Sequence, residues 1–305
     1  MDRPSNPLVG VVIVNWNGLA DTVVCLESVL RSSYSPLHVI VVDNGSQGDD
    51  AAAIRQRFGG KVEVIETGRN LGYAGGCNVG IRAALGQGCQ FVLLLNNDAR
   101  VSSDCIAQLM RAAQGLPQAG ALCPKIYFAE RPNIVQSTGG RVNLWTGTAR
   151  QVGRGEPDMG QWETLAERDY ADGACMLIAR PALEAVGLLD EEYFAYWEET
   201  DWCFRAREKG FRCYYVPTAH AWHRGASSFS PSRYHFYYRR GVFMFLRKRA
   251  TPLHLLTAIL YHVLVLAPLF LLKNPAQAGR LAIEARALLW HLRNPVHRET
   301  IVSQR

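Results

Sequence analysis

The amino-acid sequence predicts an α/β fold whose central sheet is mostly parallel and flanked by helices. Short apolar runs alternate with amphipathic helical patterns through roughly the first hundred residues, which is the signature of βαβ units. The runs lack alternating polar positions, as expected for strands that are buried on both faces. Several runs also end abruptly in asparagine or aspartate, which predicts that polar groups gather at the carboxyl edge of the sheet.

Length and composition describe a globular protein. A chain of 305 residues with 48% hydrophobic and 20% charged residues buries a sizeable core and is not disordered. The 8 cysteines are scattered, without a CxxC pair or a metal-ligand spacing, so we expect reduced core residues of a cytoplasmic protein. The N-terminal stretch has no apolar signal-peptide core, so we expect no export of the domain.

The elements of the N-terminal part follow in a regular order. Strands are expected at Val9–Val14, Leu37–Val42, Val62–Ile65 and Phe91–Leu95. The intervening segments are a helix from Leu19 to near Ser32, helical residues ending at Phe58, and a glycine-rich loop at Asn70–Gly80 that runs into a helix.

The second part is less regular. After a helix N-cap at Ser102-Ser103, the expected elements are a helix to Gln114, a strand at Leu122–Phe128, a strand at Cys175–Ile178, a helix starting at Arg180-Pro181, and a helix from about Asp201 to Lys209. Asn133–Glu167 has little periodicity and is expected to be a long loop or a β-ribbon insertion that contacts an acceptor.

The C-terminal part is basic and apolar. A basic cluster at Arg239–Arg249 suits an anionic partner, and because no RNA-binding or helix-turn-helix pattern accompanies it, we favour a membrane over nucleic acid. Leu253–Leu272 carries no formal charge apart from two histidines. It is a peripheral or re-entrant hairpin, a membrane span, or a helix packed on the sheet. Arg280–Arg298 suits a helix that lies in the membrane surface.

The stretch Asn96–Asp98 directly follows the strand expected at Phe91–Leu95. That strand must end there, because a carboxylate cannot be buried unpaired. Hard oxygen ligands at the carboxyl end of a strand suit Mg²⁺ or Mn²⁺ that carries a diphosphate. Asn15 and Asp43 follow two other strands in the same way and should border the same crevice. The alternative for Asn96–Asp98 is a turn that caps the next helix.

Phe194–Gly210 places three acids behind aromatic residues. Glu198, Glu199 and Asp201 follow Phe194, Tyr196 and Trp197. Aromatic shielding raises a carboxyl pKa towards that of a useful general base. Capping of a helix N-terminus is the alternative, and it accounts for Asp201 but not for the two glutamates.

Seven stretches in a fixed order make the chain resemble a family 2 glycosyltransferase of the GT-A fold, within the rhamnosyltransferase-like bacterial branch that builds cell-surface polysaccharides. The stretches are Val11–Gly18, Val41–Ser46, Asn70–Gly80, Leu93–Ala99, Asp172–Arg180, Tyr196–Gly210 and Trp222–Ser227. The resemblance covers about residues 7–250, and so many motifs in order are highly specific.

The resemblance implies an inverting transfer of a sugar from a nucleotide sugar. It implies a nucleotide site formed by Val14, Asn15, Asn17, Asp43, Asn70, Gly72, Gly75, Asn78 and Asn97. The residues expected to contact the donor or acceptor sugar are Asp172, Gly173, Ala174 and Trp197.

The resemblance also implies a divalent metal, Mg²⁺ or Mn²⁺. Asn96-Asn97-Asp98 matches the metal-binding DxD signature, so Asp98 would hold the cation that bridges the diphosphate. His223 matches a position that completes coordination in some relatives, although a loop histidine is otherwise more often a surface or core residue. The first position of the signature is Asn96, which would hold the metal with less charge.

The general base implied by the resemblance is Glu199. Glu198-Glu199 matches a motif whose second acid deprotonates the acceptor hydroxyl. The commoner residue at that position is Asp, and the extra methylene of Glu moves the carboxylate on the scale where reacting-group geometry matters. Glu198 and Asp201 therefore remain alternatives for the base.

The expected organisation is a catalytic domain over residues 1–235, with a nucleotide-binding half at about 7–100 and an acceptor half at about 101–235, and a helical membrane-associating region over 236–305. We expect a dTDP- or UDP-sugar donor carrying rhamnose or another hexose, and a lipid-linked or polysaccharide acceptor. The expected location is the cytoplasmic face of the inner or plasma membrane, and the sequence is compatible with an oligomer.

Two other functions fit parts of the sequence. A nucleotidyltransferase would share the fold, but the chain has no basic glycine-rich loop near its N-terminus to cradle a triphosphate. A non-catalytic membrane scaffold of a polysaccharide assembly complex would not require the intact set of Asp43, Asp98, Glu199 and His223.

Overall fold

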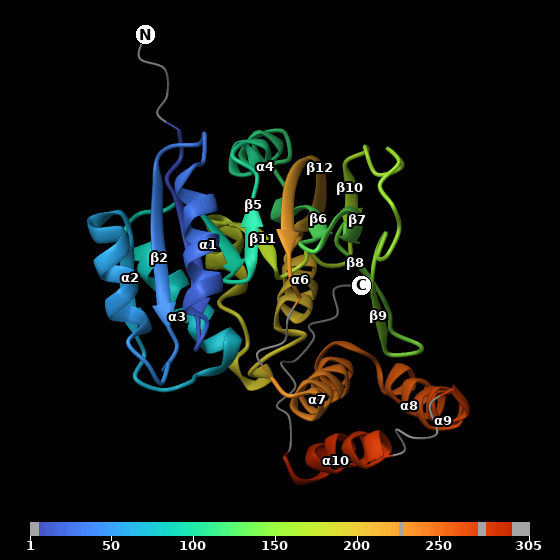
Figure 1. Ribbon diagram of the computed structural model, residues 1–305. Coiled ribbons are helices and arrows are strands. Elements are labelled where there is room, and N and C mark those ends of the chain that lie inside the picture. Colours follow the sequence, from blue (N-terminus) through green and yellow to red (C-terminus); the bar gives the residue numbers. More distant parts are fainter. Residues whose placement is uncertain (1–5, 226–228, 274–278, 295–305) are drawn as a thin grey trace.

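The computed structural model describes residues 6–225, 229–273 and 279–294, and it confirms the predicted α/β fold (Figure 1). The strands of the main sheet follow the spatial order β10-β12-β6-β11-β4-β1-β2-β3, with β5 paired to β12 and β7 paired to β6. Their bounds are Val9–Asn15 (β1), Leu37–Asp43 (β2), Glu63–Glu66 (β3), Phe91–Asn96 (β4), Ala99–Val101 (β5), Ala119–Phe128 (β6), Arg131–Ser137 (β7), Ala166–Arg168 (β10), Cys175–Ala179 (β11) and Arg212–His223 (β12).

The predicted parallel sheet is the N-terminal half of the observed one. Strands β3, β2, β1 and β4 are parallel, whereas β11 runs antiparallel between β4 and β6. The register pairs Asn15 with Asp43, and it pairs Val14 with Asn96. The polar residues that end these three strands therefore lie side by side at the carboxyl edge of the sheet.

Helices cover both faces of the sheet. They are Leu19–Leu30 (α1), Asp50–Phe58 (α2), Gly72–Gly86 (α3), Cys105–Gln114 (α4), Arg180–Val186 (α5) and Glu198–Glu208 (α6). Glycines let α3 approach β1 closely: a Cβ at Gly80 would lie 2.2 Å from Val12 Cγ1, and one at Gly76 would lie 2.8 Å from Val14 Cγ1. All eight cysteines are free and buried, as expected for core residues.

Two helices begin differently from the predictions. Asp104, rather than Ser102 or Ser103, precedes α4 directly, and the Ser102 hydroxyl donates to its carboxylate at 2.7 Å. Helix α6 begins at Glu198 rather than at Asp201, so both glutamates belong to its first turn. The macrodipole favours acids there, and the left-handed Trp197, at φ 78°, turns the chain into the helix.

The predicted insertion at Asn133–Glu167 is a β-ribbon. It contains most of β7 and a two-stranded hairpin formed by β8 (Gly140–Asn143) and β9 (Thr148–Gln151). The tip of this hairpin points towards the C-terminal helices in Figure 1.

The C-terminal helices lie beyond the carboxyl ends of the strands (Figure 1). They are Pro231–Arg249 (α7), Pro252–Tyr261 (α8), a π-helical turn at His262–Leu266, Ala267–Lys273 (α9) and Gly279–Arg293 (α10). The predicted domain boundary at 235/236 falls inside α7, and the predicted surface helix Arg280–Arg298 extends beyond residue 294 and thus past the described residues. The division into domains itself stays a prediction.

The basic cluster at Arg239–Arg249, for which an anionic partner stays a prediction, makes its observed contacts within the protein. Lys248 forms an ion pair with Asp190, and Arg249 forms one with Asp201 at 2.7 Å. The other arginines of the cluster bind backbone carbonyls or a histidine. The cluster therefore joins α7 to its neighbours within the protein.

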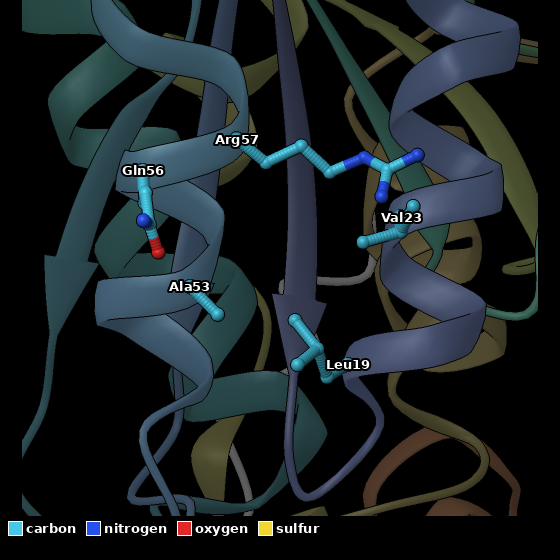
Figure 2. A pocket seen from close by; sticks show the side chains of 5 residues that line it. All are labelled: Leu19, Val23, Ala53, Gln56 and Arg57. Carbon is cyan, nitrogen blue, oxygen red and sulfur yellow. The ribbon is translucent and has the colours of Figure 1, made fainter.

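A shallow hollow of about 230 Å³ lies between α1 and α2 (Figure 2). Its lining residues are Leu19, Val23, Ala53, Gln56 and Arg57. Arg57 forms an ion pair with Glu27 at 2.6 Å. The other lining residues are apolar apart from Gln56, so the hollow has no group of side chains suited to catalysis.

Candidate active site at the carboxyl edge of the sheet

The ends of β1 and β2 are joined by a buried amide. Asn15 is fully buried, and its Nδ2 donates to Asp43 Oδ2 at 2.8 Å and to Asp50 Oδ2 at 2.9 Å. Its Oδ1 accepts from the Thr22 hydroxyl at 2.7 Å. With both amide atoms bound to the protein, Asn15 positions Asp43 and is not itself exposed to a ligand. The exposed Asn17 has φ 52° and accepts a hydrogen bond from a backbone N–H of the same edge.

The loop before α3 is held against β2 by a residue that the sequence reading did not single out. Asn44 is 2% exposed; its Oδ1 accepts from the Leu71 N–H at 3.0 Å, and its Nδ2 donates to the Gly72 carbonyl at 2.9 Å. Asn70 Oδ1 accepts from the Gly72 N–H at 2.8 Å. The only signal for Asn44 was its place inside the second motif.

The start of α3 contacts the segment before α6. Gly72 has φ 78°, and a Cβ there would lie 2.4 Å from the Phe194 carbonyl oxygen, which accepts from the Tyr73 N–H at 2.6 Å. A positive φ and this close approach both require glycine. Gly72 therefore brings the strained segment before α6 to the carboxyl edge of the sheet.

Gly75 and Asn78, which were expected to line the nucleotide site, are packing residues. Gly75 is buried, and a Cβ there would lie 2.7 Å from Leu71 Cβ. Asn78 is 1% exposed, and its amide exchanges hydrogen bonds with the backbone of Leu189 at 2.8 and 3.0 Å. Both residues hold α3 in place, and their contact with a nucleotide stays a prediction.

The residues predicted to hold a metal do meet. Strand β12 pairs antiparallel with β5 and sets His223 opposite Ala99, next to Asp98. His223 Nε2 lies 3.1 Å from Asp98 Oδ1 and 3.2 Å from Asn96 Nδ2. On its other side, Nδ1 lies 2.8 Å from Gln136 Oε1. An amide oxygen only accepts, so we assign the proton to Nδ1, and the lone pair of Nε2 accepts from Asn96 Nδ2 beside Asp98.

The same cluster contains polar oxygens without partners. Asn96 Oδ1 and Asp98 Oδ2 are buried and make no hydrogen bond. Buried polar atoms are nearly always paired, so unpaired ones indicate a missing ligand. A carboxylate, an amide oxygen and an imidazole nitrogen fit Mg²⁺ or Mn²⁺. In the described part of the chain no three His, Cys, Asp or Glu side chains form a metal cluster, and this set has only two such residues.

Asn97 has a different role from its neighbours. Its Nδ2 donates to the Thr22 hydroxyl at 3.1 Å, and a Cβ at Gly18 would lie 2.4 Å from that nitrogen. Asn97 thus packs against the start of α1, so the structure gives it a positioning role where a nucleotide contact was expected.

Glu199 lies beside Gly173, just before β11, the strand next to β4 in the sheet. A Cβ at Gly173 would lie 3.2 Å from Glu199 Cγ, and Ala174 accepts a hydrogen bond from the Asn96 N–H at 3.0 Å. Burial, and next the charge of Asp172, raise the pKa of Glu199 to about 7. The side chain is only partly covered, so Glu199 combines access with a pKa suited to a general base.

Asp172 is positioned by the insertion. Gln151 of β9 donates to its Oδ2 at 2.6 Å, and the Ala174 N–H donates to its Oδ1 at 3.0 Å. Asp172 is 6% exposed, so the β-ribbon helps to set the charge that faces Glu199.

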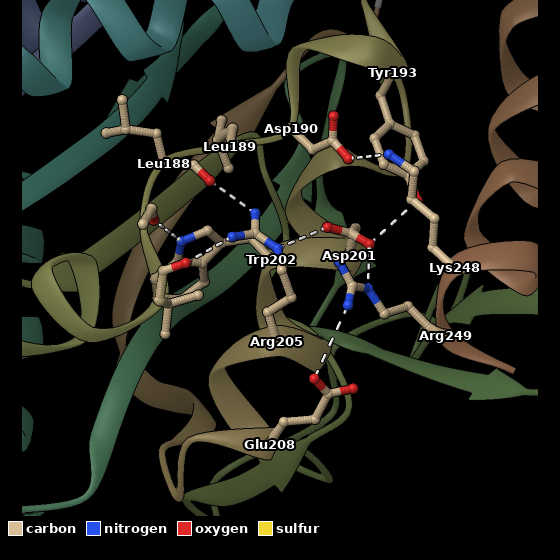
Figure 3. A network of polar contacts seen from close by, with 12 residues as sticks. Leu188, Leu189, Asp190, Tyr193, Asp201, Trp202, Arg205, Glu208, Lys248 and Arg249 are labelled. Carbon is tan, nitrogen blue, oxygen red and sulfur yellow. Dashed lines mark hydrogen bonds and ion pairs between the residues drawn. The ribbon is translucent and has the colours of Figure 1, made fainter. Parts of the chain in front are cut away.

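The two other acids in the first turn of α6 point into the protein. Glu198 is 4% exposed, its Oε2 has no partner, and burial followed by the charge of Glu199 raises its pKa well above the usual value. Asp201 is fully buried; its carboxylate binds Arg205 at 2.9 Å and Arg249 at 2.7 Å (Figure 3). Asp201, an alternative for the base, is therefore saturated by structural ion pairs.

The segment before α6 is strained. Phe194, Tyr196 and Trp197 have φ values of 63°, 69° and 78°, and among the described non-glycine residues only Asn17 shares this region. Such strain concentrates at functional sites. Trp197, expected to contact a sugar, is 3% exposed and packs on Phe245 with ring centroids 5.1 Å apart. It belongs to the core between α6 and α7.

The sequence matches the model of the family "Glycosyl transferase family 2" over residues 10–183. The chain belongs to this family. It is 29% identical over 219 residues to the low-salt glycan biosynthesis hexosyltransferase Agl10 of Haloferax volcanii, covering 69% of this chain and 66% of that protein. It is 30% identical over 253 residues to the N-acetylglucosaminyl-diphospho-decaprenol L-rhamnosyltransferase of Mycobacterium tuberculosis, covering 73% of this chain and 79% of that protein.

Solved structures agree on the fold. GalNAc-T7 with UDP, GalNAc and Mn²⁺ has a TM-score of 0.63 at 16% identity, covering 81% of this chain and 48% of that one. The mannosyltransferase PcManGT from Pyrobaculum calidifontis, with GDP-Man and Mn²⁺, has a TM-score of 0.60 at 17% identity, covering 95% of this chain and 76% of that one. The predicted GT-A fold and the rhamnosyltransferase-like branch of the family are both confirmed.

Proposed function

We propose that this family 2 glycosyltransferase transfers a hexosyl group, rhamnose or a related sugar, from a nucleoside-diphosphate sugar to a lipid-linked acceptor, with inversion at the anomeric carbon. The named activities of the curated relatives support a hexosyl or rhamnosyl donor, and the mycobacterial relative is named for a lipid-linked acceptor. Asp43 and the loop at Asn70–Gly72, both at the carboxyl edge, would bind the nucleoside.

The donor diphosphate would lie at the cluster of Asp98, Asn96 and His223. These three side chains would hold a divalent cation, which supplies positive charge against the departing diphosphate when bound. The observation that carries the proposal is the pair of buried, unpaired oxygens of Asn96 and Asp98 beside the inward-facing Nε2 of His223.

Glu199 would act as the base. Its carboxylate accepts the proton of the acceptor hydroxyl as that oxygen attacks the anomeric carbon and the bond to the diphosphate breaks. The pKa of about 7 means that a substantial fraction of Glu199 is ionised at neutral pH and still basic enough to take the proton. Asp172 and Gly173 flank this carboxylate, where the reacting sugar would lie.

Calorimetric titration of dTDP, UDP and GDP, with and without Mn²⁺, tests the proposal. We expect one nucleotide to bind the wild type in a Mn²⁺-dependent manner and the Asp98→Ala variant at least tenfold more weakly. Glu184→Gln, which changes an exposed acid on α5, is the control and should bind like the wild type. If no nucleoside diphosphate binds under any of these conditions, the transferase proposal is wrong, and the result favours a non-catalytic membrane scaffold.

A further inference from the structure

One helical face is unusually apolar and exposed. The window Pro252–Leu269 has a mean hydropathy of 1.8, yet only 11% of it is buried inside the protein. Its large exposed side chains are Leu253, Leu256, Leu260, Val263, Leu264, Val265 and Leu269. Exposed apolar surfaces of this extent mark protein or membrane contacts rather than ordinary solvent-facing surface.

The tip of the β8–β9 hairpin extends this face. Trp145 is 53% exposed, and its ring lies 4.3 Å from that of His254 in an edge-on contact. The hairpin is tied to the helix, because the Thr146 carbonyl accepts from His262 Nε2 at 3.0 Å. A tryptophan beside a row of leucines is typical of a surface at the boundary between lipid and water.

The middle of the helix is held against the protein. Ala258 is fully buried, and His262 is 4% exposed with its ring 5.4 Å from that of Phe243. His262 Nδ1 also lies 3.0 Å from the Arg239 guanidinium. A helix that crossed a bilayer would carry this arginine and the bonded Thr146 carbonyl to the hydrocarbon centre, where such groups are costly. The contacts therefore favour a helix lying in the membrane plane.

Charge selects the kind of lipid. Apart from the cluster at Arg239–Arg249, which is bound within the protein, residues 231–305 contain seven Lys and Arg and only two Asp and Glu, while the chain as a whole has a net charge of +6. On α10, which packs on α7 among the C-terminal helices, the side chains of Arg286 and Arg293 are exposed. Basic residues flanking an apolar face attract anionic headgroups.

We propose that helix 252–272 and the hairpin tip at Trp145 form one docking face for an anionic bilayer, with the helix in the plane of the membrane and not across it. In Figure 1 the C-terminal helices lie beyond the carboxyl ends of the strands, on the side of the candidate active site. A lipid-linked acceptor in the same leaflet would then enter the site from the membrane. The docking face does not depend on the proposed transfer reaction, because it is tested without substrate.

Flotation with vesicles tests the face. We expect the full-length protein to float with vesicles of phosphatidylglycerol and phosphatidylcholine, and more weakly with phosphatidylcholine alone. The double variant Leu256→Gln/Leu260→Gln should partition at least tenfold less, and Trp145→Ser several-fold less. The control is Val24→Gln/Leu30→Gln, which replaces apolar residues that are 52% and 38% exposed on α1 and should float like the wild type.

Two results would overturn the proposal. One is equal flotation of the wild type, the Leu256→Gln/Leu260→Gln variant and the Trp145→Ser variant. The other is a wild type that does not float and that sediments as a dimer, together with a Leu256→Gln/Leu260→Gln variant that sediments as a monomer. The face would then bind a second copy of the chain.

The orientation is tested with membranes from cells that express the full chain. Carbonate at high pH should release the protein, and Asn294→Cys in inverted vesicles should react with an impermeant maleimide, since all native cysteines are buried. Retention in carbonate together with protection of the cysteine would show a membrane span and overturn the in-plane arrangement.

Discussion

Glu199 and Asp201 lie two positions apart in the first turn of α6 and have opposite surroundings. Asp201 is fully buried with two arginine partners and a hydrogen bond from the Tyr193 hydroxyl at 3.3 Å. Glu199 has no cationic partner among the described residues, accepts a long hydrogen bond from Thr200 at 3.4 Å, and has its pKa raised to about 7. A saturated carboxylate builds the fold, while an unsatisfied one at an accessible edge is available for chemistry.

The largest effect on activity is expected from Glu199→Gln. The amide keeps the size of the side chain but cannot accept the proton of the acceptor, so kcat should fall by about 10² to 10⁴-fold. Nucleotide binding should stay within a factor of about 3, and thermal stability should not decrease. A transfer assay alongside calorimetry measures both; unchanged kcat in Glu199→Gln would remove Glu199 as the base.

Asp201→Asn should have the opposite profile. Arg249, with a side chain 4% exposed, would lose its 2.7 Å ion pair with Asp201, and breaking such a buried pair costs about 3–5 kcal/mol of unfolding free energy. Chemical denaturation measures this loss. Glu208→Gln is the matched control, because Glu208 contacts the same arginine at 3.9 Å and is 44% exposed, so its loss should cost less than about 1 kcal/mol. Equal losses in both variants would contradict the contrast drawn for α6.

Periodicity predicted the scaffold well because its strands are fully buried. The apolar runs at Val9–Val14 and Phe91–Leu95 became β1 and β4, and their polar ends meet at one edge, as predicted. Short, continuous apolar runs of this kind are typical of strands that are buried on both faces of a sheet. His223 was predicted to join Asn96 and Asp98 only from the resemblance to a known family, because the sequence around it has no pattern typical of a metal ligand.

Sequence could not show which polar side chains the protein itself would satisfy. Asn15, Asn78 and Asp201 looked like Asp98 and Glu199 in the sequence, because each is a polar residue within a motif. Their roles depend on partners far along the chain, such as Leu189 for Asn78 and Arg249 for Asp201. Such pairings arise from tertiary packing, which local pattern does not contain.

The pH dependence of the reaction also tests the contrast between Glu199 and Asp201, with a smaller expected effect. If Glu199 must be ionised, kcat/KM should fall about tenfold per pH unit below pH 7 and level off above it. Asp172→Asn removes the negative charge that, after burial, contributes most to the raised pKa of Glu199. The pH at which kcat/KM begins to fall should therefore be lower in this variant. A pH profile with saturating Mn²⁺ checks this. If kcat/KM does not fall below pH 7, or if the fall remains in Glu199→Gln, then Glu199 is not the group whose ionisation controls the rate.

The smallest effect concerns Glu198, whose buried Oε2 has no partner. Burial raises its pKa well above the usual 4.5, so the folded state holds the proton that the unfolded state releases. Its contribution to stability is thus fully present below pH 4.5 and is lost as pH rises towards the folded pKa. Glu198→Gln resembles the protonated form and should match the wild type at pH 4.5 but exceed it at pH 8.5, by on the order of 1 kcal/mol. Thermal unfolding at both pH values measures the difference, with the exposed Glu184→Gln as a pH-independent control. If Glu198→Gln is less stable at pH 8.5, then Glu198 is held by partners as Asp201 is, and Glu199 alone stands apart in this turn.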